Sequence, residues 1–320
     1  MPAQAPHWQP RAQIPHLHQR AAILNQIRHF FAQAQVLEVE VPFVGRGGSC
    51  DPWLDSYVLH TSQPPLYLQT SPEFYMKRLL CAGSGPIWTH SRCFRRAEVG
   101  RYHHPEFSML EWYRPDWSLA DLQQEVEALV NQVLGTQSSQ TLTYIEAMQT
   151  YAGLHPLRAS AQAIQKQAIQ VLGYTPQTDW PMTEYLDVIF THAVEPQLHR
   201  YPRLWLTEFP AAQAALARTF TNTDGDLVAA RAELYIQGIE IANAYHELQD
   251  ANEQARRFQA DREQRQALAK EDVLPDYDLL AALEAGLPEC SGVALGLDRL
   301  CMLAFKVDSL AQAMSFTWAD

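Results

Sequence analysis

Residues 93–113 read CFRRAEVGRYHHPEFSMLEWY, and this stretch decides the fold class. Residues 87–94 and 107–113 have the composition of strands, and the charged segment 95–106 between them has the composition of a loop. Because alternate side chains of a strand share a face, Glu111 and Tyr113 lie on the same side of the second strand as Phe107. A carboxylate and a phenol beside an aromatic ring predict one wall of a binding pocket.

The segments around this stretch predict an α+β fold with an antiparallel sheet flanked by helices. Several strands follow one another without regular βαβ alternation, and helices stand at both ends of the chain. Ser71 is predicted to be an N-cap and Pro72 the first residue of a helix that stops at Gly83. The other predicted elements are a helix over 16–34, a strand from 37 to Pro42, a strand over 204–209, a hairpin over 233–245 turning near Gly238, a helix over 253–270, a strand over 290–296 and a helix over 297–305.

Composition limits the class of protein. The 320 residues carry 24 Lys and Arg against 36 Asp and Glu, a formal charge of −12, which disfavours non-specific binding to nucleic acid. The five cysteines form no CxxC pair, so we expect reduced thiols in a cytoplasmic protein. The polar amino terminus and the lack of a long apolar run predict neither a signal peptide nor a membrane span.

Three separated segments resemble the three motifs of class II aminoacyl-tRNA synthetases. The chain resembles motif 1 at VLEVEVPFV (36–44), motif 2 at 93–113 and motif 3 at GVALGLDRLCML (292–303). This resemblance implies one catalytic domain over residues 1–320 with the class II fold, in which motif 1 builds a homodimer interface. The stretch of about 135–180 is expected to be a helical insertion.

Within the class, the chain is most similar to the lysyl branch. TSPEFYMKRLL (70–80) and GIEIANAYHELQDANEQARRF (238–258) resemble strings of lysyl-tRNA synthetase. The motif 1 helix begins near His16, so we expect no anticodon-binding domain. Ser71 and Ala294 replace the usual Ala and Gly of that branch. In its length, and in having Ser71 and Ala294 at these positions, the chain resembles the truncated lysyl-synthetase paralogues that attach (R)-β-lysine to elongation factor P.

The resemblance implies an ATP site on motifs 2 and 3. Such a site needs cations against the phosphates, because positioning and charge neutralisation carry phosphoryl-type chemistry. By resemblance Arg95 grips the α-phosphate and Arg299 the γ-phosphate, and both are predicted to be catalytic. Ala97 stands where relatives have Glu, so either Glu98 replaces that carboxylate or the contacts with ATP are weaker. The predicted ATP-binding residues are Arg95, Arg96, Ala97, His103, His104, Phe107, Glu240, Ile241, Gly296 and Arg299.

The resemblance also implies a site for the amino acid and for Mg²⁺. A lysine-like substrate needs anions or phenols to receive its ammonium groups. Glu240 and Glu247 resemble carboxylates that hold Mg²⁺ beside ATP, a role suited to oxygen ligands. Their odd spacing puts them on opposite faces of a regular strand, so a bulge or bend must intervene or one of them has another role. The predicted substrate-binding residues are Ser71, Glu73, Glu111, Tyr113, Asn243, Glu247 and Ala294.

The expected function is therefore ATP-dependent activation of (R)-β-lysine, or of lysine, and its transfer to a lysine of elongation factor P. Three alternatives are weighed against it. A free-standing lysyl-tRNA synthetase-like enzyme is disfavoured by the acidic balance, so tRNA is not the expected partner. An ammonia-using asparagine synthetase is disfavoured by the lysyl-like strings around Lys77 and Asn243. A regulatory paralogue without catalysis is disfavoured because Arg95 and Arg299 are both present.

Overall fold

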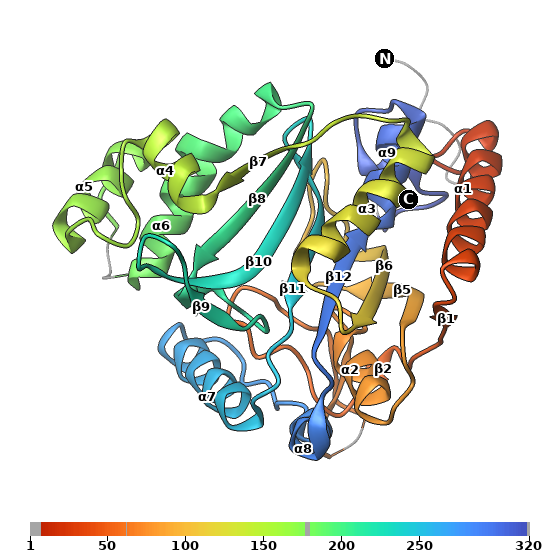
Figure 1. Ribbon diagram of the computed structural model, residues 1–320, viewed down its shortest axis with the longest axis horizontal. Helices are drawn as coiled ribbons and strands as arrows, with labels where there is room; N and C mark the ends of the chain where they lie inside the picture. The colour runs from red at the N-terminus through yellow and green to blue at the C-terminus, as the bar shows by residue number, and fades with distance from the viewer. Residues whose placement is uncertain (1–7, 62, 177–179, 319–320) are drawn as a thin grey trace. The chain divides into compact units, whose positions relative to one another are not determined.

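The computed structural model describes residues 8–61, 63–176 and 180–318, and the chain forms two compact units (Figure 1). The first unit comprises the chain up to Trp117, residues 124–135 and the chain from Gln249 onward. The second unit comprises residues 118–123 and 136–248. Helix α3 (Leu119–Leu134) runs from the second unit into the first.

The strands β5 (Ile87–Phe94) and β6 (Glu106–Pro115) of the first unit carry the segment quoted above. They pair antiparallel, with Ile87 opposite Tyr113. On the other side of β6 lies β12 (Cys290–Gly296), also antiparallel. The short strand β1 (Leu37–Glu38) adds a parallel edge to β5. The predicted α+β class with an antiparallel-rich sheet is confirmed.

Helices cover one face of this sheet. Helix α1 (Ile14–Gln33) buries Ile23, Ile27 and Phe31, because these residues recur at helical spacing on one side. The ring of Phe31 stacks on Trp88 of β5 at 4.8 Å and meets Trp112 of β6 edge-on at 5.3 Å. Helix α9 (Leu297–Phe305) packs beside α1 and against β6. Because Trp112 faces α1, the neighbouring residues Glu111 and Tyr113 point to the other face of β6, which α1 does not cover.

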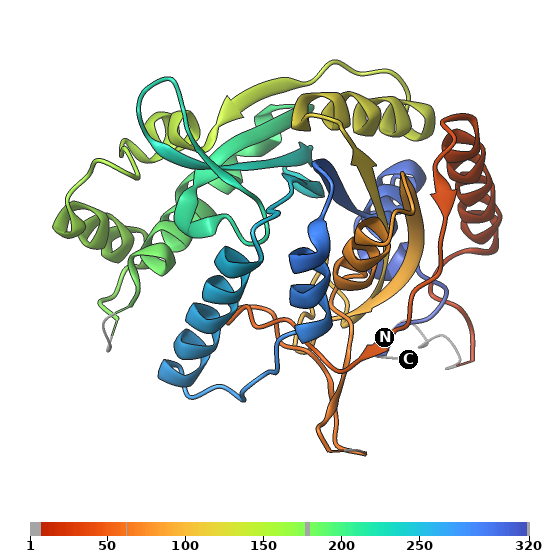
Figure 2. The same cartoon turned by 60° about the horizontal axis from the view of Figure 1, so that its bottom comes forward.

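Smaller elements complete the first unit. Helices α2 and α8 lie side by side, and α7 packs next to α8 (Figure 2). A three-stranded antiparallel sheet has the order β2, β4, β3. The bounds of these elements are α2 Glu73–Cys81, α7 Ala251–Ala267, α8 Tyr277–Gly286, β2 Val44–Gly45, β3 Val58–Leu59, β4 Leu66–Leu68 and the 3₁₀ turn Leu310–Ala313.

The second unit contains strands β7 to β11. Strands β8 and β10 pair antiparallel, β10 pairs antiparallel with β9 and β11, and β7 lies parallel to β8. The bounds are β7 Gln140–Thr143, α4 Tyr144–Ala152, α5 Ala161–Leu172, α6 Met182–Ile189, a π-turn Phe190–Val194, 3₁₀ turns Glu195–Arg200 and Ala211–Gln213, β8 Arg203–Pro210, β9 Thr219–Thr221, β10 Leu227–Ile236 and β11 Ile239–His246.

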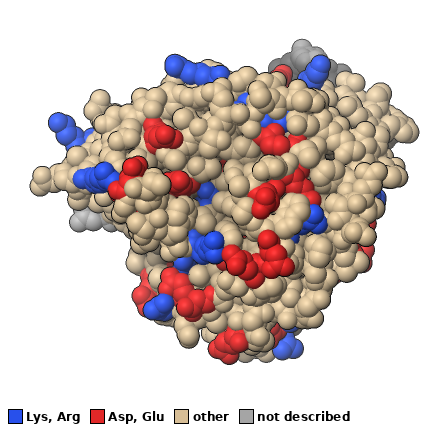
Figure 3. All heavy atoms as spheres, viewed as in Figure 1, with Lys and Arg blue, Asp and Glu red and all other residues tan. Residues whose placement is uncertain are grey.

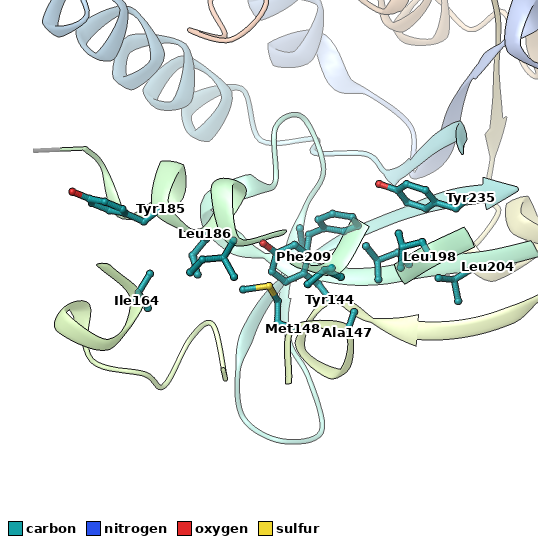
Figure 4. Close-up of a cluster of buried hydrophobic side chains, with 14 of the residues drawn as sticks. Tyr144, Ala147, Met148, Ile164, Tyr185, Leu186, Leu198, Leu204, Phe209 and Tyr235 are labelled. Atoms are coloured by element: carbon teal, nitrogen blue, oxygen red, sulfur yellow. The ribbon is translucent and has the colours of Figure 1, made fainter. Parts of the chain in front are cut away.

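Helices α4, α5 and α6 pack on strands of the second unit through a buried apolar cluster (Figure 4). Met148 of α4, Ile164 of α5 and Leu186 of α6 meet Leu204 and Phe209 of β8 within it. Helices occupy much of the stretch expected to be a helical insertion, and the helical region continues past residue 180 to Arg200. The cluster shows that this region shares a hydrophobic core with the strands that follow it.

Most predicted elements are confirmed, although several boundaries are wrong by a few residues, and three of these differences have a visible cause. The strand predicted from residue 37 to Pro42 ends at Glu38, although the Val39 amide still donates to the Trp88 carbonyl oxygen at 2.9 Å. Helix α2 begins at Glu73 with Pro72 as N-cap, because the Ser71 hydroxyl accepts from the Glu73 amide in a tighter turn. Helix α7 ends at Ala267 and not at 270, because Leu268 and Ala269 donate backward to close the last turn.

Candidate active site

Glu111 is the centre of the predicted amino-acid site. Its side chain is only 2% exposed, on the face of β6 opposite α1. The Tyr113 hydroxyl donates to Glu111 Oε1 at 2.8 Å, and the Ser71 hydroxyl donates to Glu111 Oε2 at 3.2 Å. Two oriented hydroxyls hold the carboxylate in place, since hydrogen bonds to an ionised acceptor are stronger than neutral ones. The predicted trio of Ser71, Glu111 and Tyr113 is therefore assembled in the first unit.

Strand β12 lines the same face. The register pairs Ala294 with Glu111, Gly292 with Tyr113 and Gly296 with Met109. Directly opposed residues of antiparallel strands point to the same side, so the Ala294 methyl lies beside the Glu111 carboxylate. Gly292 and Gly296 carry no side chain, so of these three residues only Ala294 places a side chain, a methyl group, on this face.

Glu73 stands at the start of α2 with a cationic partner that sequence reasoning missed. Lys77 Nζ lies 2.6 Å from Glu73 Oε1, and the Lys77 side chain is 1% exposed. The signal was present, because Glu73 and Lys77 are four residues apart on a predicted helix. The buried pair orients the Glu73 carboxylate next to Ser71, whose hydroxyl accepts from the Glu73 amide at 3.0 Å.

The predicted α-phosphate arginine lies over an aromatic ring. The Arg95 guanidinium is centred 5.0 Å from the Phe107 ring, and Arg95 Nε donates to the Thr70 carbonyl oxygen at 3.4 Å. The Glu98 carboxylate is 3.7 Å from Arg95 Nη1. Glu98 thus supplies a carboxylate to this loop near the position where Ala97 lacks one.

The backbone of the loop is held at Arg96. The Arg96 amide donates to the Asp55 carbonyl oxygen at 2.7 Å, and Arg96 Nη1 lies 3.8 Å from Glu271 Oε2. Ala97 follows with φ of 67°, a left-handed conformation that costs a non-glycine residue about 1 kcal/mol. The loop therefore turns sharply directly after the two arginines.

The predicted γ-phosphate arginine contacts the same loop. Arg299 Nε donates to the Tyr102 carbonyl oxygen at 3.1 Å, and Arg299 Nη2 lies 2.8 Å from His103 Nε2. The Arg299 side chain runs past Gly296, where an added Cβ would stand 3.6 Å from it. Arg299 and His103, from motifs 3 and 2, are therefore brought together.

His104 is contacted by the end of the described chain. The Trp318 amide donates to His104 Nε2 at 3.0 Å, and Trp318 Nε1 donates to Glu106 Oε2 at 3.3 Å. The other ring nitrogen of His104 lies close to the Glu106 carbonyl oxygen, at 2.5 Å. Both His104 nitrogens are thus engaged by the protein, and Trp318 was not among the predicted residues.

The remaining predicted residues, Glu240, Ile241, Asn243 and Glu247, belong to the second unit. The β10–β11 register pairs Tyr235 with Glu240 but Leu234 with Ala242, so Ile241 is an extra residue in β11. This β-bulge shifts the alternation by one. Glu240 and Asn243 therefore share a face despite their odd spacing, and the same parity extends to Glu247. A bulge, one of the two explanations that the spacing left open, is present.

A buried ion pair on β10 lies on the same face of the hairpin and was missed in the sequence. Glu233 pairs in register with Asn243, its Oε2 accepts from the Tyr235 hydroxyl at 2.7 Å, and its Oε1 binds the Arg231 guanidinium. Burial raises the pKa of the Glu233 carboxyl, and the Arg231 charge opposes that shift. The negative charge of Glu240 acts in the same direction as burial. The register of the hairpin is the signal that reveals Glu233.

The oxygen donors of this face suit a hard cation. Glu240 and Glu247 supply carboxylates, and the buried Asn243 Oδ1 accepts no hydrogen bond from the described part of the chain. Within residues 8–61, 63–176 and 180–318, three or more His, Cys, Asp or Glu side chains are nowhere gathered to hold a metal ion. Mg²⁺ is commonly held by one or two carboxylates together with substrate phosphates, so two carboxylates fit it.

Comparison with known families decides the class. The family model for tRNA synthetases class II (D, K and N) matches residues 10–319. The chain belongs to this family. The class II catalytic fold expected from the motif 1, 2 and 3 segments is confirmed, and ATP-dependent amino-acid ligation is the chemistry of the family.

Individual relatives narrow the resemblance. The chain is 44% identical over 317 residues to the elongation factor P–(R)-β-lysine ligase of Salmonella paratyphi A, and the match covers 97% of each chain. Relatives of the same name from Salmonella dublin and Salmonella heidelberg show the same identity and coverage. The resemblance to the truncated lysyl-synthetase paralogues is confirmed.

Proposed function

We propose that this protein is an ATP-dependent ligase that activates (R)-β-lysine as an adenylate and transfers it to a lysine side chain of elongation factor P. The observation that carries the proposal is the Glu111 carboxylate, buried and held by Tyr113 and Ser71, with the Ala294 methyl opposite it. A fixed buried anion is the chemistry needed to receive an ammonium group, and the added methyl favours one substrate shape.

The first step joins the amino acid to ATP. A carboxylate oxygen of the amino acid attacks the α-phosphorus, an oxygen–phosphorus bond forms, and the bond to pyrophosphate breaks. Arg95 and Arg299 neutralise the phosphate charge that shifts during this displacement. Phe107 beneath Arg95 supports the guanidinium by a cation–π contact at 5.0 Å.

The second step forms the amide. The amine of the acceptor lysine attacks the activated carbonyl carbon, a carbon–nitrogen bond forms, and AMP leaves with the electron pair of the broken bond. The attacking nitrogen loses one proton to solvent. Within the adenylate, Glu111 and Tyr113 are proposed to keep the ammonium end fixed while the carbonyl reacts.

Glu240 and Glu247 are proposed to hold Mg²⁺, with Asn243 contacting the amino acid. When bound, Mg²⁺ supplies charge neutralisation for the phosphates of ATP. The shared face created by the bulge at Ile241 supports this assignment. Glu233 is balanced by Arg231, so its charge adds less to the face than the charges of Glu240 and Glu247.

The proposal also includes the oligomeric state, the cellular location and the kind of acceptor. A homodimer through motif 1 is supported by apolar side chains exposed near it, Ile14, Leu37 and Phe43. A cytoplasmic location is supported by the five cysteines, all of them free thiols. None of the described helices is long and apolar enough to cross a membrane. On the face in Figure 3, basic side chains lie scattered among acidic ones, which supports a protein acceptor over tRNA.

The test is the intact mass of unmodified elongation factor P after incubation with this protein, Mg-ATP and (R)-β-lysine. Parallel reactions contain α-lysine, or tRNA as acceptor. A mass gain on elongation factor P that is largest with (R)-β-lysine is the expected result. Acid-precipitable lysine on tRNA, with no gain on the protein, would replace the proposal by a lysyl-tRNA synthetase-like activity.

A further inference from the structure

Arg20 is a half-buried cation of helix α1 that none of the site predictions uses. Its side chain is 16% exposed, and its Nη2 atom reaches two oxygens in the first unit. Arg20 Nη2 lies 2.7 Å from Asp298 Oδ1 and donates to Ser108 Oγ at 2.9 Å. A single nitrogen atom therefore binds α9 and β6 to α1.

Asp298 connects these elements from the other side. Its side chain is 3% exposed and its Oδ2 atom accepts from the Ser108 amide at 2.6 Å. The carboxylate thus joins the first turn of α9 to the backbone of β6 while Arg20 balances its charge. A buried carboxylate that loses its cation is strongly unfavourable, so the pair depends on both partners.

Each end of this connection continues into a predicted ATP contact. Asp298 directly precedes Arg299, the proposed γ-phosphate residue, within the first turn of α9. Ser108 directly follows Phe107, whose ring lies under the guanidinium of Arg95, the proposed α-phosphate residue. The Asp298 carboxylate therefore sets the spacing between the segments that carry the two arginines.

We propose that Arg20 is a positioning residue for ATP: through Asp298 and Ser108 it holds the Arg299 and Arg95 segments at the separation that the triphosphate requires. The inference rests on the proposed function for the identity of the nucleotide. It predicts that helix α1, which precedes motif 1, contributes to ATP binding. An error of about 1 Å in the placement of such groups lowers rates on the order of a hundredfold.

The experiment measures ATP–pyrophosphate exchange for Arg20→Met and Arg20→Lys. Arg20→Met is expected to raise the KM for ATP about tenfold or more and to leave the KM for the amino acid within about twofold. Arg20 contacts Asp298 Oδ1 and Ser108 Oγ through a single nitrogen atom, which a lysine ammonium could replace. The variant Arg20→Lys is therefore expected to retain most of the affinity for ATP. In the double variant Arg20→Met with Asp298→Asn, the rise in KM is expected to be smaller than the product of the single effects.

Arg114→Met is the matched control. Arg114 forms a comparable pair with Glu125, at 3.2 Å between β6 and α3, and neither residue belongs to the predicted site. The control is expected to lower the melting temperature without changing the KM for ATP. The proposal is overturned if Arg20→Met lowers the melting temperature as much as Arg114→Met does but leaves the KM for ATP at the wild-type value.

Nucleotide binding separates this inference from the proposed function. Titration of each purified variant with a non-hydrolysable ATP analogue needs no amino acid and no acceptor. If wild type binds the analogue and Arg20→Met binds it about tenfold more weakly, the positioning role stands whichever amino acid is activated. Equal binding by both proteins would overturn the positioning role, even if elongation factor P is modified as proposed.

Discussion

Replacing Glu111 by Gln removes one buried negative charge and keeps the shape of the side chain. In the structure Glu111 accepts from Tyr113 at 2.8 Å and from Ser71 at 3.2 Å and is 2% exposed. Loss of one partner of a buried charge pair costs about 2–5 kcal/mol, which corresponds to about 30- to 5,000-fold in affinity. We therefore expect Glu111→Gln to raise the KM for (R)-β-lysine by at least about 30-fold.

The assay is amino-acid-dependent ATP–pyrophosphate exchange, with the KM for ATP measured in the same series. Glu125→Gln is the control, because Glu125 is also a buried carboxylate of the first unit, bound by Arg114 and by Trp112 Nε1 at 3.0 Å. It is expected to affect stability only. An unchanged KM for the amino acid in Glu111→Gln, or an equal rise in Glu125→Gln, would refute the assignment of Glu111 as the ammonium receptor.

Three further outcomes are expected. Ala294→Gly removes the methyl opposite Glu111 and should change the ratio of kcat/KM for (R)-β-lysine over α-lysine about tenfold, measured by exchange with each amino acid. Glu240→Gln should raise the Mg²⁺ concentration for half-maximal exchange about 10- to 100-fold, measured by Mg²⁺ titration at fixed ATP. Burial and the nearby Asp51 charge raise the pKa of the Asp261 carboxyl from 3.8 to about 6. The folded state therefore holds this proton more tightly than the unfolded state does, and the free energy of unfolding falls as the pH rises between these two values. Asp261→Asn should therefore melt higher than wild type at pH 8 and show no such gain at pH 3.5, measured by thermal denaturation at both values; an equal gain at both would contradict the cause.

Local patterns predicted the strands and helices of the two arginine motifs well. Residues 87–94 match β5, and residues 297–305 match α9, because hydrophobic periodicity and turn composition act over short distances. The alternation along β6 also placed Glu111 and Tyr113 on one face, where a hydrogen bond joins them. A strand has a fixed period, so this juxtaposition needed no tertiary information.

The residues at which strands end were less predictable from the sequence, and so was the pairing between strands. Among the described residues, the strand after α1 pairs only with the edge of β5 and ends at Glu38, and no local pattern reveals where that pairing stops. The bulge at Ile241 follows from pairing with β10, so only the register shows that Glu240 and Asn243 share a face. Pairing across a hairpin depends on both strands together.

By itself, the sequence determined the family, the two motif arginines and the residue types of the amino-acid site. These properties depend on short strings and on strand or helix period, which neighbouring residues set. Only the tertiary structure decided that Ala294 stands opposite Glu111, that Glu233 is balanced by Arg231, and that Arg20 reaches Asp298. The last contact joins residues 278 positions apart, and its geometry exists only when α1 and α9 pack on the same sheet.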